Sequence, residues 1–310
     1  MGGALDFVHG DRDVLDVLRT RRAAGSRPGK REDDLRVALV VEGGGMRGVY
    51  AGGMVSALES LGMRDAFDDV YGTSAGAFSA VALAIGEGSK AGAVYYEDLA
   101  SSDFINYRRA LTGRGPLISL DYLVEHVLEK AKPLDYELLA NSDIPVRTVA
   151  TRLDTGVAEE LSGLSTADDW RAALCATSCI PFLCGPAISL QGAQWIDGSV
   201  AEPIAIERAL ERSATHVLVL LSRAPTEKSL KGGEHPLMSV VARGLDPVVA
   251  EALRRRAEKH ATAMQLLTGK GLLALRPATD CGVNGLTTNI PRLRRAEETG
   301  AAAVHAVFAA

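Results

Sequence analysis

The sequence predicts an α/β fold, a three-layer α/β/α sandwich with a largely parallel central sheet. Two short runs, residues 37–41 and 217–221, are apolar at every position, which is typical of strands buried on both faces of a parallel sheet. Strand-like and helix-like segments alternate along most of the chain, as expected where helices connect parallel strands. A serine-containing turn at residues 72–76 lies between one such strand and a helix.

The composition is that of an ordinary folded protein. The chain has 310 residues, of which 47% are hydrophobic, and it can therefore bury a sizeable core. Its formal net charge of −5 is too small to indicate binding to nucleic acid or strong electrostatic attachment to a membrane. The N-terminus lacks a signal-peptide pattern, and no run of about 18 apolar residues occurs. We therefore expect no membrane span and a cytoplasmic location.

Four cysteines occur, and their spacing does not favour a metal site. Cys175, Cys179 and Cys184 cluster, whereas Cys281 lies far from them. A zinc site usually takes paired cysteine knuckles and four ligands, and no histidine lies near this cluster. We therefore expect buried, reduced thiols and no bound metal.

The first part of the chain is expected to lie at the periphery. Residues 11–22 form a candidate helix with apolar side chains on one face. Residues 23–34 are polar and contain glycine and proline, which is typical of a loose linker. We therefore divide the chain into a peripheral segment, residues 1–34, and one main domain, residues 35–310, whose last part is a helical and strand extension.

A glycine-rich turn follows the first buried strand and precedes a helix predicted at residues 49–61. Residues 43–48 fit the pattern Gly-x-Gly-x-x-Gly of dinucleotide sites. That interpretation requires an acidic residue at the end of the next strand, whereas Asp68 and Asp69 lie inside the strand that leads to Ser74. Alternatively, bare glycine amides converge on one point and form an oxyanion hole. We favour the oxyanion hole because of a second motif, although a turn without a ligand also fits.

The second motif is the Gly-x-Ser-x-Gly at residues 72–76. A short strand, residues 67–71, precedes it, and an apolar helix, residues 75–85, follows. So sharp a turn lifts the serine above the end of the sheet, at a helix N-terminus whose partial positive charge favours a developing alkoxide. Ser74 is therefore the candidate nucleophile. The alternative is an N-capping serine in an ordinary glycine-rich connection.

The stretch between residues 95 and 139 has mixed helical patterns, including a candidate helix at residues 120–130. Within it, residues 103–114 carry three arginines among aromatic and aliphatic side chains. This composition fits a rim that faces phospholipid head groups. A charged, solvated surface is the interpretation that we favour. Whether residues 95–120 form a lid stays open.

A hairpin is predicted to deliver a candidate aspartate. The elements expected here are the paired strands 146–153 and 157–162, the helix 166–177, and the hairpin strands 187–190 and 194–196. Asp197 and Gly198 follow the last strand, where a side chain can point out of the sheet. In isolation, Asp197 would be interpreted as a turn residue.

The remainder of the chain continues the alternation of helices and strands. The elements expected here are helix 204–214, strand 217–221, helix 246–267, strand 272–275 and helix 292–308. No internal repeat stands out, so a single sandwich accommodates all of them.

Taken together, the glycine-rich turn, the Gly-x-Ser-x-Gly turn and the Asp-Gly pair resemble the motifs of the patatin-like phospholipase family. The most similar group is bacterial and writes its first motif Glu-Gly-Gly-Gly-Met-Arg-Gly, as residues 42–48 do here. Residues 176–182 resemble the helix exit that precedes the family's aspartate, and residues 217–223 resemble its next strand. Three ordered motifs are far more specific than any one alone.

The resemblance implies a patatin-like α/β/α fold and a Ser-Asp dyad, in which Ser74 matches the nucleophile and Asp197 the general base. The backbone amides that match the oxyanion hole are those of Gly43, Gly44, Gly45 and Met46. The positions that match supporting residues of the motifs are Arg47, Gly48, Gly72, Gly76 and Gly198. The family usually has Gly or Ala after Asp-Gly, where this chain has Ser199.

The resemblance also implies an acyl ester, such as a lipid, as substrate, and a covalent acyl-enzyme on Ser74. No metal or organic cofactor is needed. An aspartate is a weak base in water, but partial desolvation raises its basicity. The rival mechanism uses a histidine, and the candidates are His126, His216, His235, His260 and His305.

Other functions stay open. The chain also fits a nucleotide-binding α/β protein that uses the glycine-rich loop, an acyltransferase that differs only in its acceptor, or a non-catalytic patatin-like protein. The expected partners are a lipid or other acyl ester and, transiently, a membrane surface, but no nucleic acid. The lipid, its chain length and the oligomeric state are not determined by the sequence.

Overall fold

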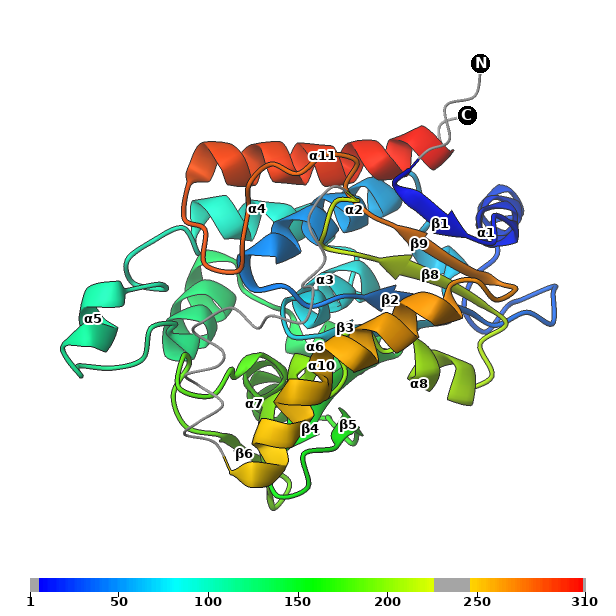
Figure 1. Cartoon of the computed structure of the whole chain (residues 1–310). Coiled ribbons are helices and arrows are strands. Elements are labelled where there is room, and N and C mark those ends of the chain that lie inside the picture. Colours follow the sequence, from blue (N-terminus) through cyan, green and yellow to red (C-terminus); the bar gives the residue numbers. More distant parts are fainter. Residues whose placement is uncertain (1–5, 226–245, 309–310) are drawn as a thin grey trace.

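A single mixed sheet forms the centre of the computed structural model, which describes residues 6–225 and 246–308 (Figure 1). Nine strands of the described residues hydrogen-bond into it. They are β1 (Val8–Gly10), β2 (Val37–Val41), β3 (Asp69–Thr73), β4 (Val146–Arg152), β5 (Ala158–Leu161), β6 (Ile188–Leu190), β7 (Ala193–Asp197), β8 (His216–Leu220) and β9 (Leu272–Leu275).

The strand order is β1-β9-β8-β2-β3-β4-β7-β6, and β5 also pairs with β4. The five consecutive strands from β9 to β4 run parallel to one another. The short strands β1, β5, β6 and β7 are antiparallel to their neighbours. The prediction of a largely parallel sheet with a hairpin leading to Asp197 is therefore confirmed.

Helices connect the strands and cover both faces of the sheet. They are α1 (Asp13–Ala23), α2 (Gly48–Ser60), α3 (Ala75–Ala84), α4 (Lys90–Glu97), α5 (Tyr107–Leu111), α6 (Tyr136–Ala140), α7 (Ala167–Ser178), α8 (Ile206–Glu211), α10 (Pro247–Leu266) and α11 (Ile290–Phe308). Short 3₁₀ turns are η1 (Gly45–Arg47), η2 (Arg64–Ala66) and η4 (Gly198–Val200), and η3 (Tyr122–Ala131) is a π-helix. None of these helices is both long and apolar enough to cross a bilayer.

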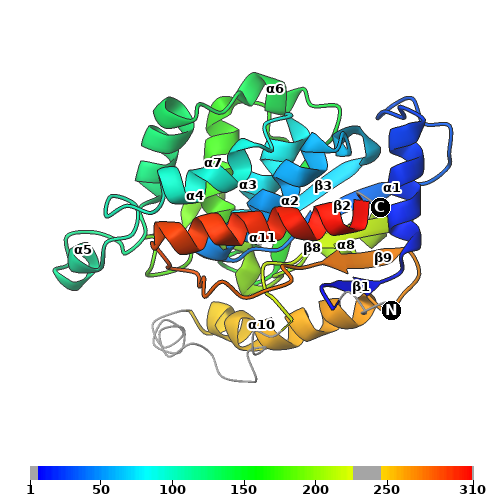
Figure 2. The same cartoon turned by 90° about the horizontal axis from the view of Figure 1, so that it is seen from above.

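Alternate side chains of the central strands pack into two different cores, and this produces the three layers. In β2, Val37, Leu39 and Val41 pack with helices α1, α2, α3 and α11. Ala38 and Val40 point the other way, into a core shared with α8 and α10. Figure 2 shows α10 on one side of the sheet and α2 and α11 on the other. The all-apolar pattern of this strand exists because helices cover both of its faces.

The N-terminal segment is more integrated than we expected. Strand β1 pairs with β9 at the edge of the sheet, and Val14 and Leu18 of α1 are fully buried. Arg21 is also buried, because its guanidinium donates hydrogen bonds to the carboxylates of Asp33 and Asp68. The sequence did not predict this, because β1 has only three residues and is too short to show a hydrophobic pattern. The burial of Arg21 depends on carboxylates that lie elsewhere in the chain. The boundary proposed at residue 34 stays a prediction.

The helix predicted at residues 120–130 exists, but its geometry differs from an α-helix. It is the π-helix η3, and the N–H of Lys132 at its end donates to the carbonyl of Val127, five residues earlier. Because only ten residues are involved, their apolar pattern does not distinguish the wider helix from an α-helix. Leu123 and Leu128 of this helix line the cavity described below.

Candidate active site

The sheet brings the three sequence motifs to one edge. Strands β2 and β3 are parallel neighbours, so the glycine loop after β2 and Ser74 after β3 emerge side by side. Strand β4 lies between β3 and β7, and its register places Thr73 opposite Val149 and Asp197 opposite Ala150. Ser74 and Asp197 therefore approach each other across the end of β4, although 123 positions separate them along the chain.

Ser74 lies on a strained turn between β3 and α3. Strand β3 extends through Gly72 and Thr73, two residues further than predicted. Ser74 itself has φ +54° and ψ −130°, which is costly for a residue with a side chain and is typical of a nucleophile turn. Its N–H donates to Thr177 Oγ1 at 2.9 Å, which holds the turn. Gly76 is required because a Cβ there would lie 2.3 Å from the Val41 carbonyl oxygen.

The Ser74 hydroxyl makes its hydrogen bond to Asp197 and not to the start of the helix. Ser74 occupies the N-cap position of α3 without a side-chain capping bond. Its Oγ donates to Asp197 Oδ2 at 2.7 Å, and both side chains are almost fully buried. The interpretation of Ser74 as a simple helix cap is therefore wrong.

Hydrogen bonds hold both the carboxylate and the backbone of Asp197. Its Oδ1 accepts from the Ser199 N–H at 2.8 Å, and its own N–H donates to the Cys179 carbonyl at 2.9 Å. Thr151 Oγ1 donates to the Asp197 carbonyl at 2.9 Å. Burial raises the pKa of the Asp197 carboxyl, although the hydrogen bonds from Ser74 and Ser199 oppose the increase. The carboxylate is thus a stronger base than an exposed aspartate.

Arg256 supports this arrangement, and the sequence analysis missed it. Its Nε donates to the Ser199 carbonyl at 2.7 Å, and a terminal nitrogen lies 3.4 Å from Ser199 Oγ. Its positive charge also favours the ionised form of Asp197. Three consecutive arginines occur in α10, and the other two pair with exposed glutamates of the same helix. The sequence gives no signal that the third one turns inward.

The glycine loop lies directly against Ser74. A Cβ on Gly43 would lie 3.0 Å from Ser74 Cβ, and Gly45 adopts φ +56°. The Met46 N–H donates to the Gly285 carbonyl at 3.1 Å, so this predicted oxyanion donor is already occupied. The N–H groups of Gly43, Gly44 and Gly45 donate no turn or loop hydrogen bond to the backbone of the described residues.

A second buried carboxylate, Glu42, precedes the glycine loop. Its Oε2 accepts from the N–H and the hydroxyl of Ser222, at 2.7 and 2.9 Å. Its Oε1 lies 3.3 Å from Nε2 of His260 on α10. Burial alone would raise the pKa of Glu42, but His260 and the Ser222 N–H lower it to about 2. The hydrogen bonds from Ser222 hold Glu42 at the start of the loop, and its lowered pKa keeps the carboxylate ionised at neutral pH.

The acidic residues required for the dinucleotide interpretation are occupied elsewhere. Asp69 begins β3, at the far end from Ser74, and its carboxylate accepts from Arg36 and Arg147. The Asp68 carboxylate accepts from Arg21 and Arg31. Neither side chain is available to bind a ribose at the glycine loop.

Within residues 6–225 and 246–308, no histidine is hydrogen-bonded to Ser74 or Asp197. His126 stacks on Tyr122, His216 faces Asp13 and His260 faces Glu42. His235 lies outside the described residues.

The cysteine cluster does not form a ligand set. The four thiols are free, and burial raises the pKa of Cys175 and of Cys179 to about 12. In the described part of the chain, no three His, Cys, Asp or Glu side chains are arranged to hold a metal ion.

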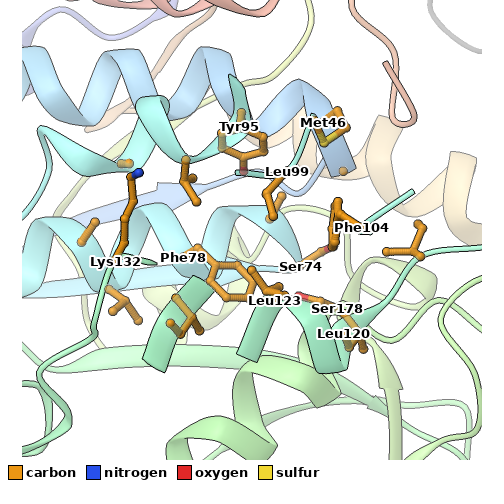
Figure 3. A pocket seen from close by; sticks show the side chains of 18 of the residues that line it. Met46, Ser74, Phe78, Tyr95, Leu99, Phe104, Leu120, Leu123, Lys132 and Ser178 are labelled. Carbon is orange, nitrogen blue, oxygen red and sulfur yellow. The ribbon is translucent and has the colours of Figure 1, made fainter. Parts of the chain in front are cut away.

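A largely apolar cavity opens beside Ser74 (Figure 3). It measures about 130 Å³, whereas one water needs about 10–15 Å³ on the same measure. Figure 3 shows Phe104 and Ser178 at the Ser74 end and Lys132 at the opposite end. Lys132 Nζ is paired with Glu97 and Asp98, at 2.8 and 2.7 Å. The Ser178 hydroxyl is buried without a hydrogen-bond partner among the described residues.

The cavity is lined by residues that are distant in the sequence. Its walls come from α3, α4, the stretch around residues 104–120, η3 and the loop at Gly285. A cavity with so apolar a lining favours a hydrocarbon group over a polar ligand.

The sequence is similar to a known protein family and to a curated protein. The family model described as "Patatin-like phospholipase" matches residues 39–210, which is more than half of the chain. "Uncharacterized protein YjjU" of Escherichia coli (strain K12) is 31% identical over 198 residues, 62% of this chain and 53% of that protein. This chain therefore spans only about half of that relative's length.

Among solved structures, VipD from Legionella pneumophila is similar with a TM-score of 0.51 and 14% identity, over 89% of this chain and 67% of that chain. This likeness concerns the fold alone. Human GIVD cytosolic phospholipase A2 matches with 14% identity over 98% of this chain and 66% of that chain. Its TM-score of 0.34 is too low to indicate a shared fold.

Proposed function

This chain belongs to the patatin-like phospholipase family, and we propose that it is a serine acyl hydrolase that cleaves lipid esters through an acyl-enzyme. One observation carries the proposal, the 2.7 Å hydrogen bond from Ser74 Oγ to the buried carboxylate of Asp197. Nucleophilic catalysis requires a nucleophile and a base within such reach of each other. The strained turn at Ser74 and the adjacent apolar cavity support the same assignment.

The first half-reaction transfers the acyl group to the enzyme. Ser74 Oγ attacks the ester carbonyl carbon while its proton moves to Asp197 Oδ2. The negative charge that develops on the carbonyl oxygen is stabilised by backbone N–H groups of the glycine loop, for which Gly43, Gly44 and Gly45 are our candidates. The C–O bond to the alcohol then breaks, and the alkoxide leaves with the proton from Asp197.

The second half-reaction regenerates the enzyme. Water attacks the acyl-enzyme carbonyl, its proton passes to Asp197, and the Ser74 oxygen leaves and recovers that proton as the fatty acid is released. An alcohol in place of water would give acyl transfer by the same steps. The burial that raises the pKa of Asp197 strengthens this carboxylate as the base in both halves.

The cavity supports a lipid acyl chain as the substrate. Its Ser74 end contains the glycine loop and the unpartnered Ser178 hydroxyl, and its walls are apolar. An ester placed at Ser74 would extend its acyl chain between α3 and η3. We therefore propose long-chain esters as better substrates than short ones.

Labelling with a fluorophosphonate probe, followed by mass-spectrometric mapping, tests the proposal. Ser74→Ala should abolish labelling and Asp197→Asn should reduce it sharply. Ser79→Ala is the matched control, because Ser79 is a buried serine of the same helix that does not line the cavity. Labelled Ser74 would then be followed by a panel of esters of increasing chain length.

Absence of labelling in folded wild-type protein would contradict the proposal. It would favour a non-catalytic patatin-like protein or a nucleotide-binding protein. A titration with NAD separates these two, since only the second would bind it. Acyl transfer to an added alcohol, measured alongside hydrolysis, separates an acyltransferase from a hydrolase.

A further inference from the structure

Helix α5 projects from the body of the molecule, as Figures 1 and 2 both show. Its side chains do not pack against a core: Leu111 is 87% exposed and Tyr107 is 57% exposed. A single exposed apolar residue is common on protein surfaces. Two large ones on the same short, projecting helix indicate an interaction surface. Phe182, on the loop that contacts the base of this projection, is 58% exposed.

The projection is held rigidly at its base, which we call the neck and define as residues 104–106 and 117–119. Ile105 and Ile118 form an antiparallel bridge, and the N–H of Asn106 donates to the Leu117 carbonyl at 2.9 Å. Arg109, a residue of α5, donates from Nε to the carbonyl of Pro116 at 2.7 Å. The exposed side chains are therefore presented by a structured element.

The neck is also a wall of the cavity beside Ser74. Phe104, Ile105 and Ile118 all line that cavity. Figure 3 shows Phe104 at the same end as Ser74. The neck is thus continuous with the projecting surface on one side and with the site of the proposed chemistry on the other.

The charge of the projection differs from that of the whole chain. Residues 103–115 contain three arginines and one carboxylate, Asp103, whereas the chain carries a formal net charge of −5. Arg108 and Arg114 are exposed. Exposed apolar side chains next to basic ones are the combination that binds an anionic lipid surface. The solvated-surface interpretation explains the arginines but not the exposure of Leu111.

We infer that α5 and its neck form a membrane-docking element, which inserts Tyr107 and Leu111 into an anionic lipid surface and directs an acyl chain along the neck to Ser74. Arg108 and Arg114 contact the phosphate groups. The occupant of this surface is a lipid bilayer, and not a protein. The delivery of an acyl chain rests on the proposed hydrolase function, whereas the docking itself does not.

Cosedimentation of the full chain with phosphatidylcholine vesicles, with and without phosphatidylglycerol, tests the inference. The double variant Tyr107→Ser/Leu111→Ser should lower partition into the anionic vesicles by about tenfold. Arg108→Gln/Arg114→Gln should lower it several-fold on anionic vesicles only, and added salt should imitate this change. Leu210→Ser is the matched control, because Leu210 is an exposed leucine on α8, far from α5 (Figure 1).

Fluorophosphonate labelling without vesicles separates this inference from the proposed function. The α5 variants should label at Ser74 at the wild-type rate, because neither Tyr107 nor Leu111 lines the cavity. Wild-type protein that does not sediment with either vesicle overturns the inference, as does equal sedimentation of the Tyr107→Ser/Leu111→Ser variant. Such a result would leave the labelling of Ser74, and with it the hydrolase proposal, untouched.

Discussion

Asp197 and Glu42 are both buried carboxylates beside the glycine loop, yet their environments have opposite effects. Asp197 accepts from a hydroxyl and one backbone N–H, and burial raises its pKa. Glu42 accepts from the N–H and hydroxyl of Ser222 and faces the His260 ring, so its pKa falls to about 2. The depth of burial is similar, and the difference lies in the partners.

This difference separates two tasks that a carboxylate performs in one site. A group that exchanges a proton with Ser74 must not be stabilised too strongly as an anion. A group that anchors the loop must not take up a proton at all. Pairs of carboxyl groups whose pKa values are displaced in opposite directions are typical of acid–base sites. Assigning the base to Asp197 and the anchor to Glu42 leads to five predictions.

The largest effect should appear in the rate of ester hydrolysis. Asp197→Asn removes the proposed base, and kcat/KM should fall by about 10²–10⁴-fold. Glu42→Gln retains the shape of the anchor, and its rate should stay within about tenfold of wild type. Kinetics on a soluble short-chain ester measures both variants. An equal loss in both would mean that the two carboxylates do not differ in function.

Stability should change in the opposite sense. Glu42→Gln should lower the free energy of unfolding by about 1–3 kcal/mol at neutral pH, because it replaces an anion whose partners favour the charged form. Asp197→Asn should raise it by about 0.5–2 kcal/mol, because an ionised group in an unfavourable site is removed. Urea titration measures both, with Asp103→Asn as a control at an exposed aspartate.

The pH dependence of stability follows from the same shifts. Since the folded pKa of Glu42 is depressed, its contribution is present above about pH 4.5 and is lost as the pH falls towards about 2. For Asp197 the folded pKa is raised, so its unfavourable contribution disappears as the pH falls. Between about pH 5 and about pH 3, the free energy of unfolding should therefore fall more in wild type than in Glu42→Gln. Urea titration of both proteins in the same buffers measures this. The same slope in both proteins would contradict the assignment of Glu42 as an anion.

A smaller effect is expected from the partner of the anchor. His260→Gln should leave a measurable esterase rate, because Ser74 is paired with Asp197 and not with this ring. In a double-mutant cycle with Glu42→Gln, the coupling energy should be about 0.5–3 kcal/mol. A rate as low as that of Ser74→Ala would instead make His260 part of the catalytic machinery.

The smallest effect should be a displacement of the pH profile. The proposed base acts as a carboxylate, so kcat/KM should fall as the pH drops through the raised pKa of Asp197. Arg256 favours the ionised form, and Arg256→Met should therefore move this acid limb to higher pH. Arg256→Lys keeps the positive charge, so its acid limb should lie closer to that of wild type. Identical profiles for wild type and Arg256→Met would show that this arginine does not act through Asp197.

Some parts of the site could be predicted because they are encoded locally. The turn at Ser74 and the loop at Gly43 are recognisable since each requires glycines at fixed offsets between a strand and a helix. Asp197 could be identified only together with those motifs, because an aspartate before a glycine is also an ordinary turn residue. The structure then showed that β2 and β3 are parallel neighbours, which brings the two turns together at one edge of the sheet.

Other parts could not be predicted, because they depend on residues that only the folded chain brings together. Arg256 is one of three adjacent arginines, and its role depends on how α10 is rotated against η4. Met46 was expected to donate to an oxyanion, but the distant Gly285 accepts its N–H. The same holds for Glu42, whose partner His260 lies more than 200 residues away in the sequence.

The sequence by itself determined the layered α/β fold and the candidate reacting groups, because hydrophobic periodicity and glycine turns act over a few neighbouring residues. Only the tertiary structure decided the protonation properties of Asp197 and Glu42, the shape of the cavity and the projection of α5. Burial, charge and exposure depend on every segment that packs around a group, and no local pattern contains that information.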